Sequence, residues 1–287
     1  MTERLAETTR RIESVHQLGV VVTAMRGIAA SRVRQAHGLL PGVQAYASVV
    51  GHAIAQGLAL VPAEHRPAKS KAGRTAVILF CAEQGFAGAF SDRMLEATLA
   101  GGQAQDLFLI GTRGAMLAAE RRIALAWHTA MVPQASLIPL LAGRIADALD
   151  RWLSEGVGQQ VDVVVPTWLA GGGVAAERRL LLPFDFRRFA VRVSGQPPLI
   201  TLAPSTLLAR LAEEYVFAEL CEAALAAFAA ENEARVATLL AAKNNLEHMQ
   251  SDLQALEQQI RQDEITAEVV ELASGAEARG LSHVSAT

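Results

Sequence analysis

A glycine-rich loop is the first place where this sequence could hold a ligand. Gly85-Phe86-Ala87-Gly88 follows an apolar run typical of a buried strand and precedes a segment with a helical pattern. Phosphate-binding loops occupy that position in dinucleotide-binding domains, because the N–H groups at the start of a helix attract anions. The spacing Gly-x-Gly-x-x-Gly is missing here, and so is the lysine of a P-loop. The sequence therefore favours a tight turn over a nucleotide site.

Two further glycine clusters have simple structural interpretations. Gly111-Thr112-Arg113-Gly114 follows a second apolar run, which predicts a strand-to-helix turn capped by Thr112. Gly171-Gly172-Gly173 lies between two segments with strand patterns, which predicts the loop of a hairpin.

Catalytic and metal-binding patterns are not recognisable elsewhere. The seven histidines are scattered without metal-ligand spacing, and no Ser/His/Asp arrangement follows from the spacing. Paired acids such as Glu213-Glu214 read as solvated helix faces. We therefore expect no catalytic residues, no metal and no cofactor.

One polar cluster, Arg261-Gln262-Asp263-Glu264, interrupts an otherwise apolar helical pattern. Arginine can hold a carboxylate with two parallel hydrogen bonds, and glutamine can both donate and accept. The cluster predicts either a docking point for a partner protein or a mere surface break in the pattern, and the sequence leaves both open.

Composition restricts the class of protein. Of the 287 residues 51% are hydrophobic and only 5% aromatic, which favours close helix packing around a sizeable core. The net charge of −3 argues against a general affinity for nucleic acid. Cys81 and Cys221 are expected to be free thiols in a reducing compartment. We expect neither a signal peptide nor a membrane span, because no run of 18 apolar residues is free of charge.

Two long helices are expected to position the residues that could contact a partner. Residues 205–274 contain neither glycine nor proline, and a helix of that length would measure about 100 Å. From residue 239 apolar side chains follow at alternating steps of three and four, which predicts a coiled-coil seam and a stop at Gly275; they are Leu239, Ala242, Leu246, Met249, Leu253, Leu256 and Ile260.

The N-terminal segment, residues 2–57, is the expected partner of that seam. Its small and apolar residues define one helix face, with a break or kink predicted after residue 37 at Gly38, Pro41 and Gly42. The residues of this face are Ile12, Val15, Gly19, Val22, Met25 and Ala29. Because both helices would leave the same domain, their pairing is expected to be intramolecular and antiparallel.

The middle of the chain predicts an α/β domain with a parallel sheet. After a polar linker at residues 62–73, strands are expected at residues 76–81, 107–110, 161–165 and 179–182. Helices are expected from Asp92, over residues 113–121 and over residues 136–154. Strands that alternate with helices are typical of βαβ units.

Motifs at both ends of the chain resemble those of the gamma subunits of F-type ATP synthases. The N-terminal match is Arg10-Arg11-Ile12, Ser14-Val15, Ala24-Met25 and Ile28-Ala29-Ala30-Ser31-Arg32. The C-terminal match is Glu233-Ala234-Arg235, Lys243, Arg261-Gln262, Ile265-Thr266, Glu268, Glu271-Leu272 and Ser274-Gly275-Ala276. Weaker matches lie at residues 85–91, 109–114 and 181–183.

The resemblance implies a Rossmann-like α/β domain whose N- and C-terminal helices form a shaft. The implied domains are residues 1–57 and 205–276 as coiled-coil helices, residues 58–204 as the α/β foot, and residues 277–287 as a flexible tail. In the family the shaft turns inside a hexamer of alpha and beta subunits, beside the epsilon subunit and on a membrane ring of c subunits, at the cytoplasmic face of a bacterial inner membrane. Contacts with the beta subunit are implied for Met25, Arg261 and Gln262, and no catalysis.

Departures from the family pattern indicate a divergent branch, such as a second ATPase with altered partners or another coupling ion. Val20-Val21-Val22-Thr23 stands where the family usually has lysines, and Glu83-Gln84 replaces an acid–arginine pair. Two alternatives stay open from the residues alone. One is an enzyme or ligand-binding protein that uses the α/β domain, and the other is a coiled-coil scaffold that associates with itself.

Overall fold

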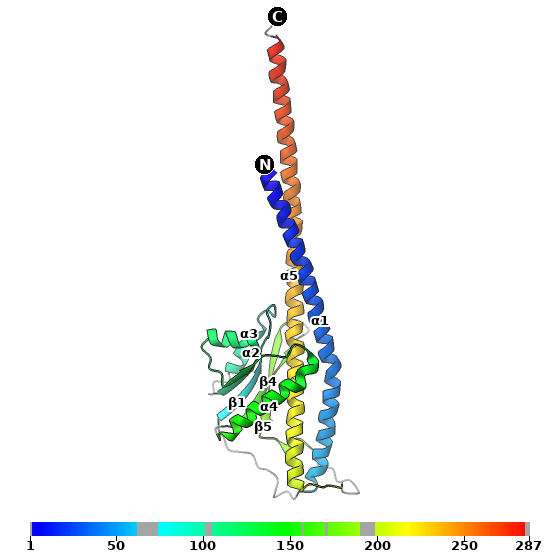
Figure 1. Ribbon diagram of the computed structural model, residues 1–287, viewed down its shortest axis with the longest axis vertical. Helices are drawn as coiled ribbons and strands as arrows, with labels where there is room; N and C mark the ends of the chain where they lie inside the picture. The colour runs from blue at the N-terminus through cyan, green and yellow to red at the C-terminus, as the bar shows by residue number, and fades with distance from the viewer. Residues whose placement is uncertain are drawn as a thin grey trace. The chain divides into compact units, whose positions relative to one another are not determined.

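The computed structural model describes residues 2–61, 74–100, 105–156, 158–169, 172–189 and 199–284 (Figure 1). The predicted linker at residues 62–73 lies outside these ranges. The chain divides into two units. Residues 1–27 and 239–287 form the coiled-coil unit, and residues 28–238 form the α/β unit.

Both terminal helices are longer than the sequence predicts. Helix α1 covers Thr2–Leu58 and helix α5 covers Pro204–Val284. A break or kink was predicted after residue 37, and the helix does not break there, because α1 continues through Pro41. A proline inside a helix costs about 3 kcal/mol, and the packing of Leu40 and Val43 against the core of the α/β unit offsets that cost.

The predicted helix end at Gly275 is also wrong, since α5 ends at Val284. One glycine costs only about 1 kcal/mol in a helix interior. The following residues, such as Ala276, Ala278 and Arg279, are strong helix formers. Residues 285–287 lie outside the described part of the chain.

A five-stranded sheet forms the centre of the α/β unit, in the order β3-β2-β1-β4-β5. Its strands are β1 (Arg74–Phe80), β2 (Gln105–Ile110), β3 (Trp127–Thr129), β4 (Gly158–Trp168) and β5 (Val174–Leu182). The first four are parallel, and β5 pairs antiparallel with β4. The four predicted strands are confirmed, whereas β3 was missed. The sheet is mixed rather than wholly parallel, because β4 and β5 form the predicted hairpin.

Helices cover both faces of this sheet, because strand β1 has apolar side chains on both of its sides. Alternate residues of β1 enter two separate cores, with Ile78 and Phe80 on one side and Val77 and Leu79 on the other. Helix α4 (Ile138–Ser154) and part of α5 cover the first side. Helix α2 (Phe90–Leu99) contributes Met94 and Leu95 to the second core, and helix α3 (Thr112–Glu120) packs beside it. Short 3₁₀ helices lie at residues 135–137 and 186–188.

Helices α1 and α5 also pack on each other inside the α/β unit. Tyr46 donates a hydrogen bond of 2.6 Å to Glu214, and His37 lies 3.2 Å from Glu233. The partner numbers on α5 rise as those on α1 fall, so the two helices are antiparallel here, as expected.

Candidate functional site

The coiled-coil unit pairs the two ends of the chain. Thr9 Oγ1 donates a hydrogen bond of 2.9 Å to Glu257 Oε1, and within this unit α1 and α5 run in opposite directions (Figure 1). The more buried residues of α1 recur at steps of three and four, as a coiled coil requires. They include Leu5, Thr8, Ile12, Val15, Gly19 and Val22. The predicted face of the N-terminal helix is therefore confirmed.

The seam of α5 (its residues that face α1) differs from the prediction at two positions. Met249 and Leu256, which were assigned to it, are 50% and 41% exposed. Gln250, Glu257 and Glu264 are more buried and follow the same spacing as Leu253 and Ile260. The register that continues through these polar residues places Met249 and Leu256 beside the seam instead of in it.

Arg261 and Gln262, two of the three residues expected to contact a partner, are exposed. The Arg261 side chain is 62% exposed, and its Nη2 atom lies 3.2 Å from Glu257 Oε1. Glu257 also accepts the bond from Thr9, so the position of Arg261 depends on the pairing of the two helices. Gln262 accepts a hydrogen bond from Thr266 Oγ1 with its backbone carbonyl.

Met25, the third of these residues, is half-buried. It belongs to the more buried face of α1 and follows Thr9 along α1, whereas Arg261 follows Glu257, the partner of Thr9, along α5. In an antiparallel pair Met25 and Arg261 therefore lie on opposite sides of that contact along the helix axes. The three residues thus lie in one unit but do not form one cluster.

The end of α5 presents apolar side chains that no part of α1 covers. Since Thr9 pairs with Glu257, the first residues of α1 lie opposite residues near 264, and α5 continues beyond them within this unit (Figure 1). Ile265, Val269, Val270 and Leu272 are 58% to 74% exposed. Such exposed apolar residues are typical of a surface that binds a partner.

In the α/β unit the glycine-rich loop is fixed by its own acidic residue, Glu83. The Glu83 carboxylate accepts hydrogen bonds from Thr112 N (2.9 Å), Thr112 Oγ1 (2.7 Å) and Met131 N (2.9 Å). It therefore lies at the N-terminus of α3, a position that favours an anion. A carboxylate of the chain fills that position.

A second set of contacts joins the same loop to α5. Glu231 Oε1 accepts hydrogen bonds from the backbone N–H groups of Glu83 (3.1 Å) and Gln84 (3.3 Å). Arg235 donates to the carbonyls of Gln84 (3.2 Å) and Gly85 (3.1 Å), and also to Glu231. These contacts pair the N–H groups of Glu83 and Gln84 and the carbonyls of Gln84 and Gly85 inside the protein.

The α5 side of this junction is almost wholly buried. Glu231, Asn232 and Arg235 are 3%, 1% and 4% exposed. Arg235 Nη1 donates a hydrogen bond of 2.9 Å to Asn232 Oδ1. Burial raises the pKa of the Glu231 carboxyl above its usual value, while Arg235 and the backbone donors oppose that rise. Sequence reasoning missed the role of this cluster. The available signal was two opposite charges four residues apart within an alanine-rich stretch.

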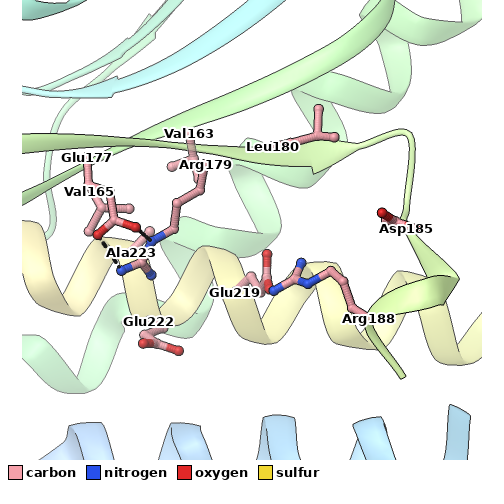
Figure 2. Close-up of a pocket in the computed structure, with 10 residues that line it drawn as sticks. All are labelled: Val163, Val165, Glu177, Arg179, Leu180, Asp185, Arg188, Glu219, Glu222 and Ala223. Atoms are coloured by element: carbon pink, nitrogen blue, oxygen red, sulfur yellow. Dashed lines mark hydrogen bonds and ion pairs between the residues drawn. The ribbon is translucent and has the colours of Figure 1, made fainter. Parts of the chain in front are cut away.

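The cavity drawn in Figure 2 tests whether the α/β unit has a catalytic pocket. It measures about 440 Å³ and lies between β5 and α5. Arg179 Nε and Nη2 bond to Glu177 at 2.8 and 2.9 Å, and Arg188 Nη2 lies 2.8 Å from Glu219 Oε1. Glu177 also raises the pKa of Arg179. Both arginines are thus neutralised by carboxylates of the chain, and the lining favours neither an anion site nor a nucleophile.

The described residues also lack a metal-ligand cluster and a membrane-spanning helix. No three histidine, cysteine or acidic side chains in that part of the chain gather as metal ligands would. None of its helices combines the length and the apolar character that crossing a membrane requires.

A comparison with families of known proteins decides the class. The family model described as ATP synthase matches residues 4–278, nearly the whole chain. The chain belongs to the ATP synthase family. The resemblance expected from the terminal motifs is therefore confirmed.

Individual members of this family that are similar to the chain are named as gamma chains. The ATP synthase gamma chain of Frankia casuarinae is 28% identical over 295 residues, which cover 97% of this chain and 98% of the relative. The gamma chain of Streptomyces avermitilis is 27% identical over 297 residues, with 97% of each chain covered. The similarity thus extends through both helices and the α/β unit.

Solved structures agree in fold. A chain of the mitochondrial ATP synthase of Euglena gracilis, in a structure of the OSCP, F1 and c-ring, has a TM-score of 0.64 at 12% identity, with 97% of this chain and 95% of that one covered. A chain of the central stalk and c-ring of the Tetrahymena thermophila enzyme has a TM-score of 0.55 at 16% identity, covering 77% and 99%. A mixed α/β sheet between two long terminal helices is the fold they share.

Proposed function

We propose that this chain is the gamma subunit of an F-type ATP synthase and works as its central rotor shaft. In this role it couples ion flow through a membrane ring to the catalytic cycle of an alpha–beta hexamer, and it carries no catalytic site of its own. The observation that carries the proposal is the antiparallel pairing of the two chain ends through Thr9 and Glu257. A paired, alanine-rich helical element can act mechanically without any reactive group.

The proposal assigns each unit a different kind of contact. The coiled-coil unit would contact the alpha and beta subunits, with Met25, Arg261 and Gln262 contacting the beta subunit. The exposed apolar residues at the end of α5, such as Val269 and Leu272, support a protein partner around that end. The α/β unit would contact the epsilon subunit and the ring of c subunits.

The physical mechanism is a population shift in the partner. As an asymmetric shaft turns, each catalytic subunit contacts a different face of it. The conformation that is most stable for that subunit therefore changes with the angle of the shaft. Differential contacts with the shaft thereby change the affinity of each catalytic site for nucleotide. The gamma chain supplies only contact free energy, which is consistent with the pairing of Arg179 and Arg188 by acidic residues of the chain.

The proposed location is peripheral, at the cytoplasmic face of a bacterial inner membrane. Its support is that similar gamma chains come from bacteria such as Frankia casuarinae, together with the partners that the proposal names. The coupling ion is set by the membrane ring, so either protons or sodium would satisfy the proposal.

Purification of the native complex tests the proposal. The affinity-tagged chain is isolated from its own host in mild detergent, and the co-purified chains are identified by mass spectrometry. We expect alpha, beta, epsilon and c subunits, with one copy of this chain per complex. A homo-oligomer without ATPase subunits would support the scaffold alternative, and saturable binding of a nucleotide to the isolated chain would support an enzyme.

A further inference from the structure

Near the glycine-rich loop, the apolar side chains that α5 buries are small. Between residues 229 and 234 each buried apolar side chain of α5 is an alanine, namely Ala229, Ala230 and Ala234. Methyl groups bury apolar area, but this attraction has no preferred direction. These alanines alone would therefore oppose only weakly a local rotation or slide of this stretch of α5, which follows the larger buried side chains of Leu225 and Phe228.

The polar contacts at the same place have fixed directions. Glu231 accepts from the N–H groups of Glu83 and Gln84, and Arg235 donates to the carbonyls of Gln84 and Gly85. Rotation of α5 by one residue would break these bonds and leave buried polar groups unpaired. Each such group costs about 1–3 kcal/mol, so one angular position of α5 is strongly preferred.

The loop that receives these bonds has contacts with other elements as well. The carboxylate of Glu83 binds Thr112 and the backbone of Met131. Arg32 of α1 donates a hydrogen bond of 3.3 Å to the side chain of Gln84. The loop is thus attached to the sheet layer and to both long helices within the α/β unit. A force on the sheet cannot move it independently of them.

We propose that Glu231 and Arg235, with Asn232 behind them, form a register lock that sets the angle of α5 on the sheet. They are positioning residues, and a turning force on the α/β unit reaches α5 through them. This second statement rests on the rotor function proposed above. A buried ion pair is a poor source of stability but can specify one arrangement among several, which is the role that the lock requires.

The test separates angular specification from stability. In the double variant Glu231→Leu with Arg235→Met, apolar side chains replace the pair, as tolerated in other buried ion pairs. The control is Arg210→Met with Glu213→Leu, an exposed pair of α5 at 2.9 Å. We expect both purified complexes to hydrolyse ATP, and the lock variant to pump at least threefold fewer ions per ATP. Equal pumping by a correctly assembled lock variant would overturn the proposal.

A conservative variant guards against a folding defect. Arg235→Lys keeps the buried charge beside Glu231 but cannot reach both loop carbonyls in the fixed geometry of a guanidinium. We expect a melting temperature near that of the parent and a partial loss of pumping. In the isolated chain the amides of Glu83 and Gln84 should exchange with solvent slowly in the parent and at least tenfold faster in the Glu231→Leu, Arg235→Met variant, which lacks their acceptor. Unchanged exchange would contradict the lock without any reference to partner subunits.

A covalent bond at the same junction should restore the lost function. A Cβ atom at Gly88 would lie 3.1 Å from Thr238 Oγ1, so Gly88→Cys with Thr238→Cys places two thiols on the loop and on α5. Because Gly88 has a φ of +56°, which strains any side chain, the same cysteine pair in the parent chain is the control. In the Glu231→Leu, Arg235→Met background, oxidation should return pumping towards the control and reduction should abolish it again. Oxidation without any recovery of pumping would exclude a register defect. Failure of the parent chain to co-purify with ATPase subunits would instead reject the rotor proposal.

Discussion

Thr9 and Glu257 are separated by 248 positions in the sequence, and their side chains share a hydrogen bond of 2.9 Å. The same carboxylate contacts Arg261, so one acidic residue connects the two helix ends to an exposed arginine. The position of a proposed contact residue thus depends on the pairing of the two chain ends.

A double-mutant cycle should measure this pairing. Thr9→Val and Glu257→Gln each weaken the bond, and we expect a coupling free energy of about 0.5–1.5 kcal/mol in the unfolding of the chain. Thr266→Val is the matched control, because Thr266 bonds only along its own helix to the carbonyl of Gln262. A coupling near zero for Thr9 with Glu257 would contradict the pairing of the ends.

The proposed contact role of Arg261 and Gln262 predicts a loss of coupling without a loss of assembly. In Arg261→Ala with Gln262→Ala, ATP-driven pumping should fall while the subunit composition of the complex stays the same. Hydrogen bonds to charged groups are worth about 1.5–3 kcal/mol each, which allows a loss of roughly tenfold or more. Glu257→Gln serves as a control, because it removes the ion pair between Glu257 and Arg261 but keeps the arginine. Normal pumping in the double variant would exclude the role.

The anion position filled by Glu83 predicts a rescue by salt. Glu83→Ala removes three hydrogen bonds and should cost on the order of 3 kcal/mol in the free energy of unfolding. Sulfate should recover part of this loss in the variant, since the donors of Thr112 and Met131 are then free for an anion. Glu120→Ala, at the exposed end of the same helix, should show neither effect. Urea unfolding with and without sulfate decides the matter.

Two glycines should respond to alanine with opposite signs. A Cβ atom at Gly114 would overlap Cβ of Cys81, so Gly114→Ala should lower the free energy of unfolding by about 1–3 kcal/mol. Gly143 lies within helix α4, and a Cβ there would have nothing within 4 Å. Gly143→Ala should therefore stabilise the chain by about 1 kcal/mol through helix propensity alone. Equal effects at the two sites would contradict the packing of α3 on β1.

Burial of the two thiols predicts a fall in stability at alkaline pH. It raises the pKa of Cys81 to about 12 and that of Cys221 to about 11, against about 8.5 for a free thiol. Above that ordinary pKa the unfolded chain releases protons that the folded chain keeps. Stability therefore falls with rising pH, by about 1.4 kcal/mol per pH unit for each thiol. Urea unfolding at pH 8, 9 and 10 should show a shallower fall for Cys81→Ala, and equal slopes would contradict the burial.

The sequence predicted the elements whose pattern of apolar residues matches their burial in the structure. The apolar runs of β1 and β2 were sufficient to predict two strands. The spacing of Ile12, Val15 and Val22 was sufficient to predict the buried face of α1. Strand β3 was missed because Trp127-His128-Thr129 is short and has no apolar run. Helix α1 does not break at Pro41, and α5 does not end at Gly275, because packing and neighbouring helix formers contribute more free energy than these two residues cost.

The candidate sites were predicted less completely, for a physical reason. Glu257 faces the partner helix, and a search for apolar residues alone passes over such a position and selects Leu256 beside it. The polar junction was missed because the burial of Glu231 and Arg235 depends on a loop about 150 positions away. No local pattern encodes that distance. The contact roles of Met25, Arg261 and Gln262 stay predictions.

The carboxylate of Glu83 has one more consequence, which concerns the metabolism around the protein. An anion that is tethered to the chain is present at the strand ends at a high and constant effective concentration. Nucleotides and free phosphate in the cell would have to displace it before they could occupy that place. The α/β unit is thus expected to keep the same shape in starved and in well-fed cells, as a part that must transmit force under both conditions should.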